Sequence, residues 1–258
     1  MSPRPTASRL AALYSEAYFD SRDPACGYSV YRSDRAAVRD KAERLLPALE
    51  RHAQRGRLLD LGCAYGFIME VARERGWEVA GIEPAQAVAV AAAESLGVPV
   101  ATDLWGAGLA AGSFDAVLVW DVIEHLPDPR LALSELARVL RPGGVLSVVT
   151  PDLGSLAARI LGRRWEEMRK MPEHIYFFNR MSLTALLRAT GFEPLEWGTV
   201  GKRMSLEETL GRLVPAAPWL WGAALTVARA CGLGRLVAYF DPRWKLVVTA
   251  RLTRPAAC

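Results

Sequence analysis

The chain has 258 residues, of which 51% are hydrophobic, and its formal net charge is +4. This length and apolar content suffice for one α/β domain with a sizeable core, and they exclude a largely disordered protein. The basic residues are scattered, with no zinc-ligand spacing and no alternation of aromatic and basic residues, so no nucleic-acid partner is expected.

The cysteines and the first residues bear on location. The four cysteines form no Cys-x-x-Cys pair, which fits a reducing compartment better than a disulfide framework. The N-terminal residues contain arginines and prolines but lack the apolar core of a secretory signal. Both observations favour a cytoplasmic location.

Residues 1–33 are expected to form an N-terminal arm. Its aromatic residues are Tyr14, Tyr18, Phe19, Tyr28 and Tyr31. The arm either packs these rings on the core or covers a bound ligand as a lid.

Residues 34–258 are expected to form the main domain. It opens with a helix that Asp34 caps and that ends near Gly56. Strands and helices then alternate. The predicted strands are 57–61, 77–82, 98–101, 114–120 and 144–149, and the predicted helices are 67–75, 85–96 and 128–140. This alternation predicts a parallel sheet with helices on both faces and ligand contacts at the carboxyl ends of the strands.

The C-terminal part predicts a helix at 182–190 and strands at about 192–197 and 244–252, separated by an insertion at about 200–240. Within it, the sixteen residues 213–228 carry no charge and contain two prolines. A membrane-spanning helix needs about 20 apolar residues, so we predict a helical lid or the oligomer face of a homodimer. Trp219 and Trp221 leave open a peripheral membrane contact through 213–228.

Arg57 to Gly66 is an apolar strand followed by a glycine-bearing turn and a helix start, which is typical of a nucleotide-binding corner. Glycines at 62 and 66 let the backbone turn sharply beside a ligand. Glu83 closes the next strand, at about the spacing at which an acidic residue reaches a ribose diol. Asp60 is unfavourable beside a pyrophosphate but suits a cationic ligand, which favours S-adenosylmethionine over a nicotinamide dinucleotide.

Leu59, Asp60, Gly62 and Gly66 resemble the first motif of class I S-adenosylmethionine-dependent methyltransferases, with Ala64 in place of the middle glycine. Residues 113–129 resemble their fourth motif, and residues 138–146 resemble the turn before their fifth strand. The resemblance implies a doubly wound, Rossmann-like α/β sheet of seven strands with an antiparallel last strand, and S-adenosylmethionine as cofactor. The cofactor-binding residues it implies are Asp60, Gly62, Ala64, Gly66, Glu83, Asp103, Leu104, Trp120 and Asp121.

Residues 173–179 resemble a segment of bacterial methyltransferases of secondary metabolism and polysaccharide assembly. This resemblance implies a small-molecule or glycan hydroxyl, free or lipid-linked, as the methyl acceptor. An oxygen nucleophile usually loses a proton, and histidine is the natural base near neutral pH. We predict His174 as this base. His125 is the second catalytic candidate or braces the turn after the fourth strand, and His52 is expected on the surface.

Three alternatives stay open. Asp121, Glu124 and His125 form a cluster similar to a Glu-His stretch of ubiquinone-pathway O-methyltransferases, but without a fixed geometry no metal is predicted. A nicotinamide-dependent oxidoreductase is a rival enzyme class. A non-catalytic cofactor-binding or scaffold module is the second rival, and it would bind the cofactor without turnover.

Overall fold

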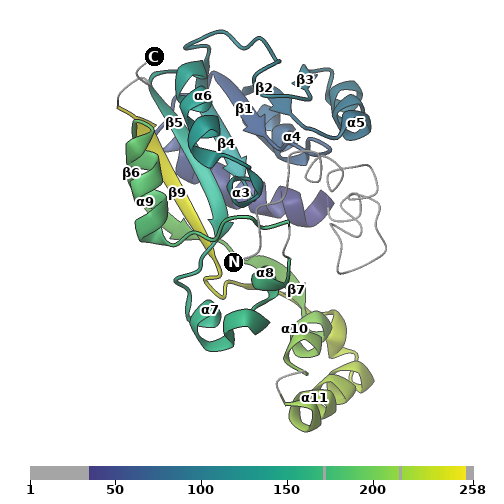
Figure 1. Ribbon diagram of the computed structural model, residues 1–258. Helices are drawn as coiled ribbons and strands as arrows, with labels where there is room; N and C mark the ends of the chain where they lie inside the picture. The colour runs from purple at the N-terminus through teal and green to yellow at the C-terminus, as the bar shows by residue number, and fades with distance from the viewer. Residues whose placement is uncertain (1–34, 171–172, 215–216, 254–258) are drawn as a thin grey trace. The chain divides into compact units, whose positions relative to one another are not determined.

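The computed structural model describes residues 35–170, 173–214 and 217–253 (Figure 1). The expected aromatic arm at 1–33 lies outside these residues. The chain divides into two compact units, one of Met1–Val200 with Arg243–Cys258 and one of Gly201–Pro242.

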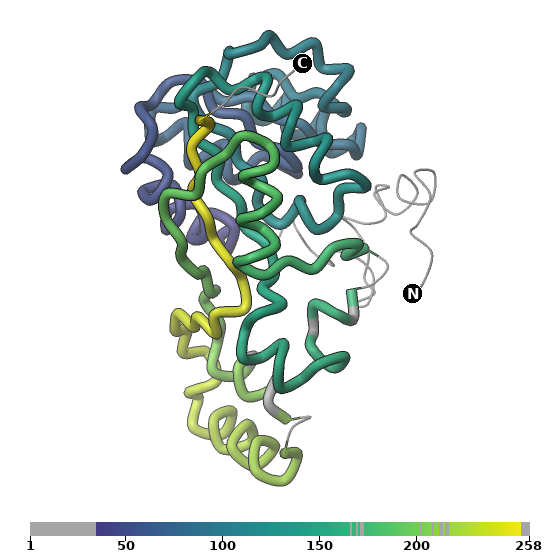
Figure 2. Tube along the Cα trace, turned by 60° about the vertical axis from the view of Figure 1, so that its left-hand side comes forward, coloured from purple at the N-terminus to yellow at the C-terminus, as the bar shows by residue number. Residues whose placement is uncertain are grey.

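The first unit is built on a seven-stranded sheet in the order β3-β2-β1-β4-β5-β9-β6. Its strands are β1 Arg57–Leu61, β2 Glu78–Ile82, β3 Val100–Ala101, β4 Phe114–Trp120, β5 Leu140–Pro151, β6 Phe192–Thr199 and β9 Lys245–Leu252. The first five strands pair in parallel, and β9 is antiparallel to both β5 and β6. In Figure 2 the yellow β9 runs beside the green β6. The predicted fold class, with its antiparallel last strand, is confirmed.

Helices cover both faces of this sheet. They are α3 Arg35–Glu50, α4 Phe67–Glu74, α5 Gln86–Leu96, α6 Pro129–Val139 and α9 Arg180–Ala189. Neighbouring residues of a strand point to opposite faces, so Leu58 joins the core under α3 and α4, whereas Leu59 joins the core under α6 and α9. Both leucines are fully buried, as expected of strands that are covered on both sides.

The fifth strand differs from the prediction at its start. Strand 144–149 was expected after a turn at Pro142, but β5 already begins at Leu140, which pairs with Phe114. The register then shifts before Ala116 pairs with Val145, so the turn lies within the strand as a bulge. The turn itself is as tight as predicted, because a side chain on Gly144 would lie 2.8 Å from the Arg141 carbonyl oxygen.

Several short elements follow the carboxyl ends of β4 and β5 and carry the candidate site. A 3-10 turn, η1 Ile123–His125, follows β4. After β5 come helix α7 Leu156–Leu161, the 3-10 turn η2 Gly162–Arg164 and helix α8 Glu166–Arg169. These elements lie at the edge of the sheet where the parallel strands end, which is where the topology predicts ligands to bind.

The second unit contains helices α10 Leu206–Leu213 and α11 Pro218–Ala230, the 3-10 turn η3 Leu233–Arg235 and two antiparallel strands, β7 Lys202–Ser205 and β8 Val237–Phe240. The helices agree with the predicted helical insertion, whereas the two-stranded sheet was not predicted. Among the described residues, no helix is both long and apolar enough to cross a membrane.

Candidate active site

The corner between β1 and α4 is a strained turn tied to its neighbour strand. Gly62, Ala64 and Gly66 all have positive φ, at 78°, 47° and 80°. The amide N–H groups of Gly62 and Cys63 both donate to the Ile82 carbonyl, at 2.8 and 3.1 Å. A left-handed conformation is costly for alanine, so Ala64 is strained in this turn. The backbone nevertheless adopts the conformation of a glycine-containing corner, although alanine stands at position 64.

Asp60 lies buried at the end of β1, with 1% of its surface exposed. Its Oδ2 atom has no hydrogen-bond partner among the described residues. Burial and the nearby Glu83 raise the pKa of Asp60 to about 7, while Lys41 opposes the increase. A buried carboxyl group with an unsatisfied oxygen is costly, and a cationic ligand group would offset that cost.

Glu83 links the corner to the loop that follows β2. Its Oε2 accepts a hydrogen bond from the Ala64 N–H at 3.0 Å, and its Oε1 accepts one from the Ala85 N–H at 2.9 Å. Burial raises the pKa of Glu83, and the two N–H groups oppose that increase. Each carboxylate oxygen has a further lone pair, so Glu83 could also accept ribose hydroxyl groups.

The other predicted cofactor residues lie in different settings. Asp103 is exposed and accepts a hydrogen bond from the Gly106 N–H, whereas Leu104 is buried. Trp120 is buried at the end of β4, and its Nε1–H donates to Ser147 Oγ at 2.9 Å. Thus Asp103 closes its own turn, and Trp120 is fixed by packing within the sheet.

Asp121 is held between two lysines. Its Oδ2 lies 2.6 Å from Lys41 Nζ, and its Oδ1 lies 2.7 Å from Lys245 Nζ. Burial alone would raise the pKa of Asp121, but the two ammonium charges outweigh it and hold that pKa well below its usual range. The residue also has a positive φ of 58°. Asp121 is therefore ionised and occupied by the lysines, which makes it a poor metal ligand.

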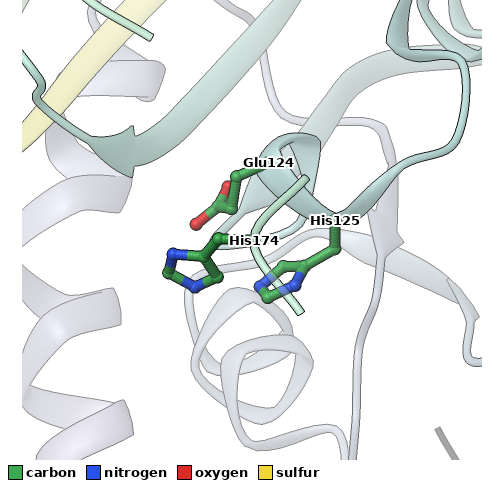
Figure 3. A group of neighbouring side chains, drawn as sticks. All are labelled: Glu124, His125 and His174. Atoms are coloured by element: carbon green, nitrogen blue, oxygen red, sulfur yellow. The ribbon is translucent and has the colours of Figure 1, made fainter. Parts of the chain in front are cut away.

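Next to Asp121, Glu124 and His125 of the predicted cluster are joined by His174, which comes from a distant part of the sequence. Glu124, His125 and His174 each offer one ligand atom, and these atoms all lie within 4.8 Å of one another (Figure 3). The two imidazole rings meet edge to face, with their centroids 4.7 Å apart. The N–H groups of Ile175 and Tyr176 both donate to the Glu124 carbonyl and clamp the His174 segment onto η1. The two predicted catalytic histidines therefore belong to one site.

Each member of the group is oriented by another residue. His125 Nδ1 lies 3.0 Å from the Glu173 carbonyl oxygen, which can only accept, so this nitrogen carries the proton. Thr150 Oγ1 donates to Glu124 Oε2 at 3.0 Å. His174 Nδ1 lies 3.8 Å from Glu167 Oε2 and makes no hydrogen bond there. Two histidines and one carboxylate could hold a divalent cation, in a different combination from the Asp121 cluster considered above.

Burial sets the protonation of this group. It lowers the pKa of His125 to about 4. Burial and then His125 lower the pKa of His174 to about 2. Burial and then the Asp121 charge raise the pKa of Glu124 to about 8. At neutral pH the group is therefore uncharged, and an imidazole pKa near 6.5 does not apply here. His52, expected on the surface, is partly buried and lies 2.9 Å from Glu196, before β1 and away from this edge.

Comparison with known proteins shows the family to which the chain belongs. A family model described as a methyltransferase domain matches residues 31–196. The chain belongs to this methyltransferase family. A solved structure from Thermotoga maritima, described as an S-adenosylmethionine-dependent methyltransferase and possible histamine N-methyltransferase, shares the fold. Its TM-score is 0.56 at 22% identity, over 86% of this chain and 94% of that one.

Two curated relatives match the same part of the chain. An uncharacterised methyltransferase of Mycobacterium sp. (strain JLS) is 35% identical over 144 residues, which are 55% of this chain and 56% of that protein. A ubiquinone biosynthesis O-methyltransferase of Cereibacter sphaeroides (strain ATCC 17029 / ATH 2.4.9) is 32% identical over 152 residues, which are 54% of this chain and 61% of that protein. The chain thus matches somewhat more than half the length of these relatives.

S-Adenosylmethionine is the cofactor that the family and the fold imply, and the corner fits it. The unsatisfied Asp60 oxygen suits the cofactor's ammonium group, and Glu83 suits its ribose. The buried carboxyl groups of Asp60 and Glu83 are unfavourable beside a pyrophosphate, which argues against the nicotinamide alternative. A side chain on Gly62 would collide with Val122 Cγ2, so glycine is needed there for packing as well as for ligand approach.

Proposed function

We propose that the protein transfers a methyl group from S-adenosylmethionine to a hydroxyl oxygen of a small-molecule or glycan acceptor, including lipid-linked acceptors. The observation that carries the proposal is the Glu124, His125 and His174 group next to the cofactor corner, at the carboxyl end of β4. The name of the Cereibacter relative, an O-methyltransferase, supports oxygen as the methylated atom.

The reaction needs alignment and removal of one proton. When bound, the cofactor supplies a sulfonium-activated methyl group for an in-line displacement. The predicted cofactor residues, from Asp60 to Asp121, would hold it on the β1 and β4 side of the edge. His174 would take the proton from the acceptor hydroxyl, because its Nδ1 has no hydrogen-bond partner among the described residues. His125 would fix the His174 ring through their edge-to-face contact.

Glu124 would stabilise the imidazolium that this proton transfer creates, because its neutral carboxyl group lies close to both histidines and one of its oxygens can accept a hydrogen bond from the charged ring. A cation bound by the same three side chains would ionise the acceptor by a different route. The metal content of purified protein and turnover after chelation separate the two: a base predicts no bound metal and full activity, whereas a cation site predicts the reverse.

The decisive experiment is transfer of a labelled methyl group from S-adenosylmethionine into an extract of the producing cell, followed by identification of the labelled product. A labelled compound whose new methyl group sits on oxygen supports the proposal. Labelling on nitrogen or carbon would refute the oxygen acceptor. Cofactor binding without any labelled product would favour the non-catalytic module.

We infer a cytoplasmic location from the two cysteines of the described residues, Cys63 and Cys231, which are both free thiols. The unit at 201–242 exposes Trp219 on α11 and Phe240 on β8, and this supports a homodimer face, an acceptor lid or a peripheral membrane contact through 213–228. No nucleic-acid partner is proposed.

A further inference from the structure

The segment 153–164, which follows β5, exposes an unusual amount of apolar surface. It comprises α7, η2 and the three residues that precede α7. Four of its large apolar side chains are exposed: Leu153 by 40%, Leu156 by 70%, Ile160 by 72% and Leu161 by 44%. Exposed apolar side chains scattered singly are ordinary, but four within nine residues of chain form a surface that calls for an occupant.

The same segment is strongly basic. Arg159, Arg163 and Arg164 are all exposed, and no Asp or Glu occurs between Asp152 and Glu166. Leu156 and Ile160 are four residues apart in α7, so they lie on one side of this helix. Arg163 and Arg164 follow the break at Gly162, where φ is 51°. The segment therefore exposes apolar and cationic side chains within a short stretch of chain.

The opposite side of the segment packs against the rest of the protein. Ser155 caps α7 by accepting a hydrogen bond from the Ala158 N–H at 3.1 Å. Ala158 and Trp165 are buried on the inner side, Trp165 completely. The Leu153 N–H donates to the Phe178 carbonyl at 2.8 Å. Since inward-facing residues fix the segment, its outward leucines and isoleucine are not needed for the core.

We propose that segment 153–164 docks the protein on an anionic membrane surface. The leucine and isoleucine side chains would enter the boundary between headgroups and acyl chains, and the guanidinium groups would bind lipid phosphates. The positive charge of the three arginines favours an anionic membrane as the occupant. A second copy in a two-fold dimer would bring the same three arginines of each chain against one another, which is repulsive.

The place of the segment in the fold also supports a membrane as the partner. It starts at the carboxyl end of β5, the same edge of the sheet at which Glu124 follows β4. A membrane bound there would face the acceptor side, as a lipid-linked acceptor requires. Docking itself does not depend on the proposed methyl transfer, so it is measured separately from activity.

The test is co-sedimentation of the full chain with vesicles of phosphatidylcholine alone or with about 30% phosphatidylglycerol. We expect at least about tenfold stronger partitioning onto the anionic vesicles, which weakens as added salt screens the charges. The variant R159E/R163E/R164E should reduce that partitioning by about tenfold or more, which corresponds to about 1.4 kcal/mol. The variant L156D/I160D should reduce it at every salt concentration.

Matched controls change similar residues elsewhere. Met181→Asp alters a side chain that is 78% exposed on α9, and Arg130→Glu reverses an exposed charge on α6. Both should bind vesicles like the unmodified chain. The melting temperature of each variant is measured in parallel, and the milder L156S/I160S replaces L156D/I160D if the latter does not fold.

Three results would overturn the proposal. The first is no partitioning onto anionic vesicles. The second is partitioning that survives both segment variants but disappears with Trp219→Asp, which would place the contact in the 201–242 unit. The third is a concentration-dependent dimer that L156S/I160S dissociates, which would make the surface a contact between copies.

Discussion

Glu83→Ala is predicted to weaken both the cofactor corner and the cofactor complex. In the unliganded protein the carboxylate accepts two backbone N–H bonds, and the side chain is 96% buried, since 4% of its surface is exposed. Alanine leaves both N–H groups without this acceptor, at about 1–3 kcal/mol each. Removing a buried carboxyl group whose burial is itself unfavourable offsets part of this loss. We expect the free energy of unfolding to fall by about 2–3 kcal/mol.

Affinity should fall as well, because the ribose loses its charge-assisted acceptor. A loss of about 1–3 kcal/mol corresponds to roughly 5- to 150-fold weaker binding. Calorimetry with S-adenosylmethionine and its demethylated product measures the affinity, and thermal unfolding measures stability. Glu78→Ala, at the start of the strand that Glu83 follows, is the matched control: its side chain is 73% exposed, so both quantities should stay unchanged. Near-native affinity and stability in Glu83→Ala would refute this account of the corner.

Three further predictions concern the turn, the base and the second unit. Ala64→Gly should preserve cofactor affinity and change the free energy of unfolding by no more than about 1 kcal/mol, because relief of the positive φ offsets the entropy of glycine; a large loss on calorimetry or melting would contradict it. His174→Ala should lower turnover by about 10²–10⁴-fold at unchanged cofactor affinity. Since burial lowers the pKa of His174 to about 2, the rate of the unmodified enzyme at saturating cofactor should not fall as pH drops through 6.5, and a fall there would contradict this role of burial. Saturation is required because the pKa of Asp60 is raised to about 7, so cofactor affinity itself changes in this range. Replacing residues 201–242 by a short linker should retain cofactor binding and abolish turnover; in the intact protein Lys202 pairs with Phe240, so the two ends of the replaced segment lie close together and a short linker can join them. Surviving turnover would exclude a role in the acceptor site.

The strands of the main sheet could be predicted because their signal is local. β1 and β4 occupy the predicted residues, 57–61 and 114–120. Both are mainly apolar, interrupted by Asp60 in β1 and Asp115 in β4, and mainly apolar strands are what burial on both faces produces. β8 was missed although its four residues, Val237–Phe240, are apolar or aromatic. The run is short and all four residues are exposed, so burial does not extend it into a longer strand signal.

The candidate site was only partly predictable, because its decisive contacts join distant residues. The class I resemblance supplied Asp60 and Glu83 as candidates before any contact was known. Lys41 and Lys245 were missed: they lie 80 and 124 residues from Asp121, and no spacing rule connects them. The meeting of His125 with His174 depends on backbone N–H groups that bind the Glu124 carbonyl, and backbone groups leave no mark on residue choice.

Asp121 and Glu124 both follow β4, but they differ in protonation because their charged neighbours differ. Lys41 and Lys245 keep Asp121 ionised, and the Asp121 charge, together with burial, keeps a proton on Glu124. Environments that push two pKa values apart assign different roles to the two groups. Asp121 offsets one of the two ammonium charges beside it, whereas Glu124, His125 and His174 carry no charge of their own. Methyl transfer from a sulfonium to a neutral hydroxyl spreads out an existing positive charge. An uncharged group of Glu124 and the two histidines therefore forms no ion pair with the acceptor, and it suits the proposed neutral hydroxyl nucleophile better than a carboxylate.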